Sequence, residues 1–121
     1  SAARDLEIQG EIMREGLVGL MRFEPDIEVV GQASDGPQAI ELAERLQPDV
    51  IVMDVSLGEM SGAEATKAIL ARNPQIKVIG LSMYIDPEVA TAMRDAGAAA
   101  YLNKGGPSED LILAIRGCRL Q

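Results

Sequence analysis

Three polar residues, Asp54, Ser82 and Lys104, each close a run of residues that has the composition of a buried strand. The runs before them cover residues 50–53, 76–81 and 99–103. Because the carboxyl ends of parallel strands meet at one edge of a sheet, a carboxylate, a hydroxyl and an ammonium group are expected around one point. Such a set suits the transfer of a phosphoryl group, whose loose and highly charged transition state needs positioning and cations rather than an acid or a base.

In that chemistry Asp54 is the expected nucleophile, Lys104 a point charge for a phosphoryl oxygen, and Ser82 a hydroxyl donor. Each residue also has an ordinary interpretation when it is taken alone. An aspartate after an apolar strand is often a turn former or a helix cap, a serine is often a turn hydroxyl, and a loop lysine is usually solvated. Only the three together indicate a chemical site.

The composition indicates one domain with an aliphatic core. The chain has 121 residues, 47% of them apolar, and its only aromatic residues are Phe23, Tyr84 and Tyr101. A net charge of −8 argues against direct binding to nucleic acid, which requires a basic surface, and the absence of histidine argues against triad hydrolases and zinc sites. No apolar stretch approaches the ~20 residues of a membrane span, and no signal peptide opens the chain. The single cysteine, Cys118, excludes an internal disulfide and is compatible with a cytoplasmic protein.

Strand-like and helix-like segments alternate along the chain, which predicts βαβ units and a parallel sheet covered by helices on both faces. Besides the three strands above, a short strand is expected over residues 27–31. Helices are expected over residues 11–23, from Gly36 to a stop at Pro48, and after Pro107.

Short local patterns define two further helices. Ser61 with Glu64 three residues later is a capping-box pattern for a helix that runs to residue 72. Asp86 followed by Pro87 is an N-cap with proline at the first helical position, and Gly97 is well placed as the left-handed terminator of that helix.

Several segments carry a resemblance to a known family. Residues 13–17, 25–31 and 33–36, with Met60 and Gly62 in the loop after Asp54, resemble the receiver domains of bacterial two-component response regulators. The group they resemble is the NarL/FixJ (LuxR-type) group of transcriptional regulators. The resemblance runs from about residue 11 to the C-terminus.

The resemblance assigns a role to each of four residues. Asp54 matches the phosphoacceptor, Ser82 the switch hydroxyl, Tyr101 the switch aromatic residue and Lys104 the lysine of the family pattern. Tyr101 and Lys104 follow Ser82 by 19 and 22 positions, which is the family spacing. Taken alone, Tyr101 is equally compatible with an ordinary half-buried strand position.

The family pattern implies a flavodoxin-like, doubly wound (βα)5 fold, with residues 1–121 as one receiver domain. It implies that a sensor histidine kinase phosphorylates Asp54 and that the change reaches a helix-turn-helix output domain C-terminal to Gln121. The chain itself is then expected to bind neither nucleic acid nor membrane, to be cytoplasmic, and to catalyse at most its own phosphorylation and dephosphorylation. A homodimer is compatible with this interpretation.

The family also holds Mg²⁺ with two acidic residues at the end of its first strand, and in this chain the other ligands would be Asp54 and the backbone carbonyl of Ser56. The two acidic positions fall on Ile8 and Gln9, neither of which carries a carboxylate. Because Mg²⁺ prefers charged oxygen ligands, we expect this site to be weak or lost.

Residues 1–10 are atypical in a second way, because Arg4, Asp5 and Glu7 are charges that a central strand of a parallel sheet does not favour. The stretch 1–7 therefore does not have the pattern of a central strand. Three accounts are open. The segment is a degenerate first strand, a foreign or rearranged segment, or a segment that lies elsewhere while another part of the chain completes the sheet.

Two other function classes are alternatives to the phosphoacceptor. A pseudo-receiver would act as a dimerisation or docking module without phosphorylation, and the loss of the acidic pair favours it. A phosphatase-like or dehalogenase-like hydrolase would also use Asp54 as nucleophile, but it expects an aspartate two residues later, where Ser56 stands. A nucleotide-binding enzyme is disfavoured because the chain has no glycine-rich phosphate loop.

Overall fold

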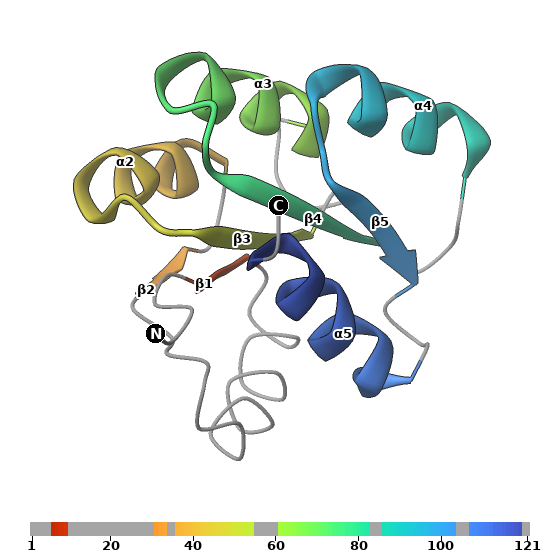
Figure 1. Ribbon diagram of the computed structural model, residues 1–121. Helices are drawn as coiled ribbons and strands as arrows, with labels where there is room; N and C mark the ends of the chain where they lie inside the picture. The colour runs from red at the N-terminus through yellow and green to blue at the C-terminus, as the bar shows by residue number, and fades with distance from the viewer. Residues whose placement is uncertain are drawn as a thin grey trace.

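The computed structural model describes residues 6–9, 31–33, 36–54, 61–82, 86–103 and 107–119. They form a five-stranded parallel sheet with strand order β2-β1-β3-β4-β5, and helices on both of its faces (Figure 1). The strands are β1 (Leu6–Gln9), β2 (Gly31–Ala33), β3 (Val50–Asp54), β4 (Lys77–Ser82) and β5 (Ala100–Asn103). The helices are α2 (Gly36–Leu46), α3 (Gly62–Arg72), α4 (Pro87–Ala96) and α5 (Ser108–Arg119). This strand order confirms the predicted flavodoxin-like, doubly wound α/β fold.

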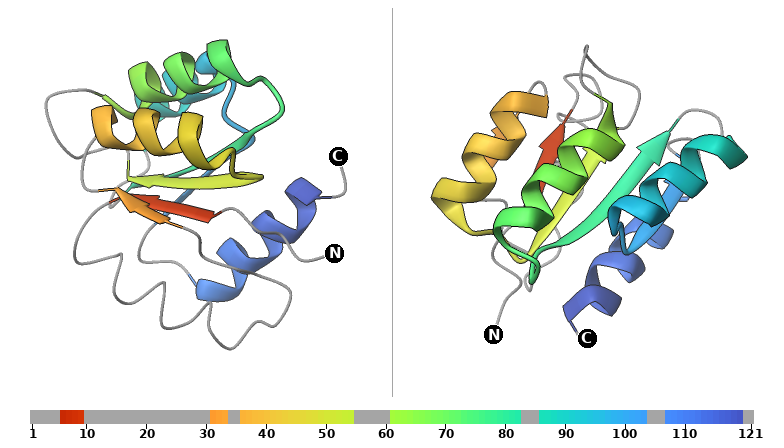
Figure 2. Two further views of the ribbon diagram at one scale, coloured as in Figure 1. Left: turned by 90° about the vertical axis from the view of Figure 1, so that its left-hand side faces the viewer. Right: turned by 90° about the horizontal axis from the view of Figure 1, so that it is seen from above.

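The described helices make two layers around the sheet. Helices α2, α3 and α4 cover one face and α5 covers the other, as the two views of Figure 2 show. None of the helices in the described ranges is long and apolar enough to cross a membrane.

The alternation of side chains along β3 explains why both faces are covered. Val50 and Val52 belong to the core cluster under α5, whereas Ile51 and Met53 belong to the cluster under α2, α3 and α4. All four side chains are buried. A strand with no polar position between its ends must be covered on both sides, as the sequence predicts.

The predicted caps of α3 and α4 are confirmed, with one difference in detail. The Glu64 backbone N–H donates to Ser61 Oγ at 3.1 Å, but the Glu64 carboxylate accepts from the Ser61 hydroxyl at 3.2 Å instead of from its backbone. At α4, the backbone N–H of Glu88 donates to Asp86 Oδ1 at 2.9 Å. Gly97 ends that helix in the left-handed region, with φ 106°.

The first strand corrects one expectation. Leu6–Gln9 form β1 at the centre of the sheet, parallel to β2 on one side and to β3 on the other. The view that residues 1–7 do not supply a central strand is therefore wrong for Leu6 and Glu7, and the account in which the segment lies elsewhere is excluded. Hydrogen bonds to two neighbouring strands outweigh the poor strand pattern of this segment.

The second strand continues past its expected end. A strand is expected over residues 27–31, and the described part of β2 covers Gly31–Ala33, where Gly31 pairs with Glu7 and Ala33 with Gln9. Pairing with β1 carries the strand past the glycine that local pattern takes as its end. Residues 27–30 and the helix expected over residues 11–23 lie outside the described residues.

Candidate functional site

The carboxyl ends of the five strands lie along one edge of the sheet, because all the strands are parallel. Asp54 is the last residue of β3 and is level with Leu81 of β4, so that Ser82 lies one residue further along the neighbouring strand. Ser82 in turn is level with Asn103, the last residue of β5. The structure thus brings Asp54 and Ser82 together at the edge where open α/β sheets bind ligands.

Ser82 is a buried polar residue, only 8% exposed, and Tyr101 is half-buried. Tyr101 is level with Gly80, two residues before Ser82, and packs against the core cluster under α2, α3 and α4. By strand alternation Ser82, Gly80 and Tyr101 lie on the same face of the sheet. Since Gly80 has no side chain, the residue of β4 that pairs with Tyr101 presents only backbone to it.

The structure describes the position of some of the other predicted site residues but not of all. Ile8 and Gln9 are placed by strand pairing at the end of β1, with Ile8 level with Val52 of β3. Lys104, and Ser56 with its backbone carbonyl, lie outside the described residues.

Two residues at or near this edge were missed by the sequence analysis. Asn103 is an exposed polar residue that ends β5 directly beside Ser82, and the signal that could have found it is the one used for Asp54, a polar residue closing a strand. Thr66 of α3 is fully buried, and its hydroxyl lies 3.7 Å from the sulfur of Met53, the residue before Asp54. No local pattern reports such a contact between a helix and a strand.

The donor chemistry of this edge can be tested against a divalent cation. The residues that end the strands are Gln9, Ala33, Asp54, Ser82 and Asn103. Only Asp54 carries a carboxylate, and within the described ranges no group of three or more His, Cys, Asp or Glu side chains could hold a metal ion. These residues do not fit a site in which several carboxylates surround Mg²⁺.

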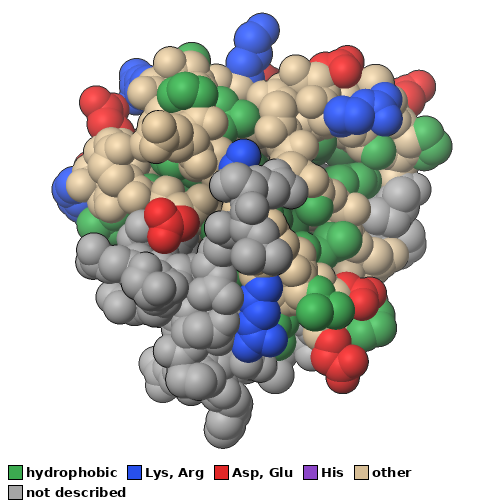
Figure 3. All heavy atoms as spheres, in the orientation of Figure 1, with side chains coloured by type: hydrophobic (Ala, Val, Ile, Leu, Met, Phe, Trp, Pro, Cys, Tyr) green, Lys and Arg blue, Asp and Glu red, His purple; other side chains and the backbone are tan. Residues whose placement is uncertain are grey.

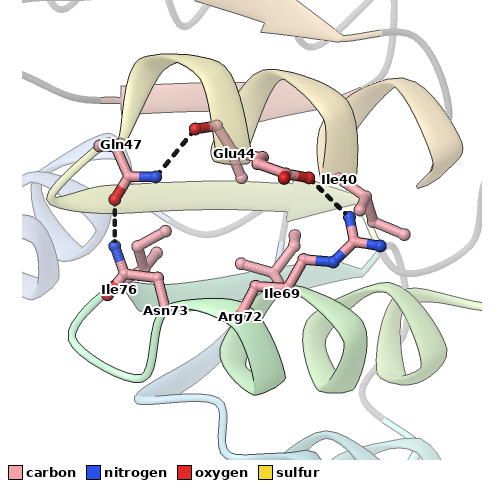
Figure 4. A pocket seen from close by; sticks show the side chains of 8 residues that line it. Ile40, Glu44, Gln47, Ile69, Arg72, Asn73 and Ile76 are labelled. Carbon is pink, nitrogen blue, oxygen red and sulfur yellow. Dashed lines mark hydrogen bonds and ion pairs between the residues drawn. The ribbon is translucent and has the colours of Figure 1, made fainter.

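A groove between α2 and α3 lies at the opposite edge of the sheet, where α2 leads into β3 (Figure 4). Its floor is apolar, with Ile40 and Ile69 among the lining residues. Polar contacts span it, because Arg72 Nη1 lies 2.9 Å from Glu44 Oε2 and Asn73 Nδ2 donates to Gln47 Oε1 at 2.7 Å. Its position at the amino edge separates it from Asp54.

Charged side chains are spread out on the face shown in Figure 3. Lys and Arg side chains stand singly or in small groups among Asp and Glu side chains, with no continuous basic patch among the coloured atoms. On this face the acidic and basic side chains are therefore interspersed, in a chain whose net charge is −8.

Comparison with known proteins identifies the family. The sequence model of the response regulator receiver domain matches residues 10–116. The transcriptional regulatory protein LiaR of Bacillus subtilis is 42% identical over 106 residues, which are 88% of this chain and 50% of LiaR. The transcriptional regulatory protein DegU of Brevibacillus brevis is 38% identical over 88% of this chain and 45% of DegU. The chain spans about half the length of these curated relatives.

Structural similarity reaches further along the chain than sequence similarity. The signal receiver domain of the response regulator NarL from Mycobacterium tuberculosis superposes with a TM-score of 0.90 and 26% identity, covering 98% of this chain and 97% of that domain. A coverage of 98% cannot omit the first nine residues, so the superposition includes β1. The sequence match, in contrast, begins only at residue 10, directly after β1. Residues 6–9 therefore take the place of a receiver's first strand with a sequence outside the family pattern.

Proposed function

The chain belongs to the response regulator receiver domain family, and from this premise we propose that it accepts a phosphoryl group on Asp54 from a sensor histidine kinase. The observation that carries the proposal is the pairing of β3 with β4, which brings Asp54 beside the strand that ends in Ser82. Lys104 directly follows Asn103, which is level with Ser82, and would supply the cation of the site.

The proposed transfer is a displacement at phosphorus. A carboxylate oxygen of Asp54 forms a bond to the phosphorus of a phosphohistidine, the P–N bond breaks, and the imidazole keeps the electron pair and takes a proton from water. Lys104 offsets charge on a phosphoryl oxygen, and Ser82 donates a hydrogen bond to another. Receiver domains are generally not enzymes, and the only catalysis we propose here is of the chain's own phosphorylation and dephosphorylation.

The signal would leave the site through Ser82 and Tyr101. Ser82 and Tyr101 lie on the same face of the sheet, so a change at Ser82 would reach the face where Tyr101 packs. Tyr101 belongs to β5, which lies between α4 and α5 (Figure 1). A two-state element of this kind is what a phosphoryl switch requires. We propose that it controls a C-terminal helix-turn-helix domain in a cytoplasmic transcription regulator, since the relatives are named as transcriptional regulatory proteins and are about twice as long as this chain.

The test is labelling with a small phosphodonor, followed by mass spectrometry of the intact chain. The wild type is expected to gain one phosphoryl group, slowly, and Asp54→Asn should gain none. Asp49→Asn is the matched control, because Asp49 immediately precedes the same strand at its other end and should leave labelling unchanged. Equal labelling of Asp54→Asn and wild type would reject Asp54 as the acceptor.

One observation favours a second function, a pseudo-receiver that docks or dimerises without phosphorylation. The strand ends of the sheet hold only one carboxylate, whereas metal-assisted transfer relies on cations to offset the developing charge. This alternative expects no label on the wild type under any donor. It also expects Asp54→Asn to leave dimerisation or docking unaltered.

A further inference from the structure

The residues at the end of β1 help to determine which ions can bind at the edge of the sheet where the strands end, which we call the Asp54 edge. Ile8 is level with Val52 of β3, so Gln9 comes level with Met53, one residue before Asp54. On its other side Gln9 is level with Ala33 of β2. On the β1 side, the residues next to the end of β3 are therefore an aliphatic residue, Ile8, and a neutral amide, Gln9, and the strand beyond them ends in an alanine.

The number of charged ligands is one of the determinants of affinity at a hard-cation site. At this edge Asp54 contributes the only negative charge among the five strand ends, and the remaining strand-end groups are neutral. A neutral amide or hydroxyl oxygen can ligate Mg²⁺, but it does not offset the cost of removing water from a small divalent ion. This result does not depend on how the Ile8 and Gln9 side chains point, since neither contains a carboxylate.

We infer that the Asp54 edge of this chain holds no resident divalent cation, and that the neutral pair Ile8 and Gln9 is the reason. This inference shares only the residue Asp54 with the proposed function. Its readout is metal binding and not phosphorylation, so one can fail while the other stands.

The experiment is a Mg²⁺ titration followed by backbone amide signals in two-dimensional NMR, with a constant excess of monovalent salt to suppress diffuse attraction to the acidic chain. The signals to follow are those of Ser82 and Asn103 at the edge. In the wild type they should move linearly and not saturate up to about 20 mM Mg²⁺, because one carboxylate is too few for a stable site. In Ile8→Asp/Gln9→Asp they should saturate at a concentration at least tenfold lower.

Two controls distinguish a specific Mg²⁺ site from the general effect of two added negative charges. The variant Gln75→Glu/Thr91→Glu adds the same two charges at exposed positions away from the edge and should behave like the wild type. Adding Asp54→Asn to the Ile8→Asp/Gln9→Asp variant should remove the gained site. The single variant Gln9→Asp, at the very end of β1, carries the test if the double variant does not fold, and a fivefold or greater gain is expected from it.

Each possible result of the Mg²⁺ titration either overturns or supports the inference. Saturation of the wild type at low-millimolar Mg²⁺ that is abolished in Asp54→Asn would overturn the inference, because the edge would then recruit ligands from elsewhere. A folded Ile8→Asp/Gln9→Asp variant that gains no binding would overturn it as well, since the end of β1 would not determine the site. Gained binding that requires Asp54, with an unresponsive wild type, supports it.

Discussion

The hydroxyl of Thr66 lies 3.7 Å from the sulfur of Met53, and both side chains are fully buried between α3 and β3. Met53 is the residue before Asp54, so the packing of α3 extends to the last core position of the strand that presents the proposed phosphoacceptor. A thioether is a weak acceptor, so this contact acts through packing more than through hydrogen bonding.

Replacing Thr66 by valine tests that reading. The change removes a buried hydroxyl whose partner among the described residues, the Met53 sulfur, is a weak acceptor, so the free energy of unfolding should stay within about 1 kcal/mol of wild type or rise. Thr66→Ser keeps the hydroxyl but deletes a buried methyl group and should cost about 1 kcal/mol. Urea unfolding followed by circular dichroism measures both, because the chain has no tryptophan for fluorescence. A larger loss in the valine variant than in the serine variant would show that the hydrogen bond dominates.

Gly97 gives a second prediction, with two separable causes. Its φ of 106° is strained for any other residue, and an added Cβ would lie 2.7 Å from Leu70 Cδ1. Gly97→Ala should therefore lower the free energy of unfolding by more than about 1 kcal/mol. In a Leu70→Ala background the clash disappears and only the backbone cost remains, so the same substitution should cost less there.

The matched control for Gly97 lies in α5. An added Cβ on Gly117 meets nothing within 4 Å, and a glycine inside a helix is less favourable than alanine. Gly117→Ala should raise the free energy of unfolding by about 0.5–1 kcal/mol. The two glycine-to-alanine changes are thus expected to have opposite signs in the same urea experiment.

The burial of Cys118 predicts that the free energy of unfolding depends on pH in the alkaline range. Burial in the cluster under α5 raises the pKa of its thiol above the ordinary value, although the positive charge of Lys77 opposes the shift. Above the ordinary pKa of about 8.5 the unfolded chain loses this proton before the folded chain does, so stability falls as pH rises through that window. The stability advantage of wild type over Cys118→Ala should therefore shrink between about pH 7.5 and about pH 10. Urea unfolding of both proteins at each pH cancels the contributions of other groups, and an advantage that grows with pH would contradict the shift.

Most of the fold follows from local sequence, because the signals that define it are local. Asp86, Pro87 and Gly97 delimit α4 through hydrogen bonds and a backbone angle within one segment. The run before Asp54 identifies β3 by its unbroken apolar character. The spacing of Ser82 and Tyr101 was read from the family pattern, and strand alternation then puts them on one face of the sheet.

What the sequence could not predict depends on contacts between distant segments. The C-terminal end of β2 is set by pairing with β1, some two dozen residues earlier in the chain, and not by its own composition. The polar bridge across the α2–α3 groove joins Gln47 to Asn73, and Gln47 adopts a φ of 52° where α2 ends before a proline. Neither residue lies in a sequence pattern that predicts its partner.

The centre of the sheet provides the last prediction. Glu7 lies in β1 between Gly31 of β2 and Ile51 of β3, in a strand flanked by neighbours on both sides. A carboxylate in the central strand of a parallel sheet costs free energy unless a partner compensates it, so Glu7→Val should raise the free energy of unfolding by about 1 kcal/mol or more. Glu41→Val, at an exposed position of α2, is the control and should change it by about 0.5 kcal/mol or less, towards lower stability. A loss of about 3 kcal/mol in Glu7→Val would instead reveal a compensated charge, because removing one member of a buried pair leaves the other without its partner. The sign of this one change therefore tells whether the unusual first strand is merely tolerated in the receiver fold or is stabilised by its charge.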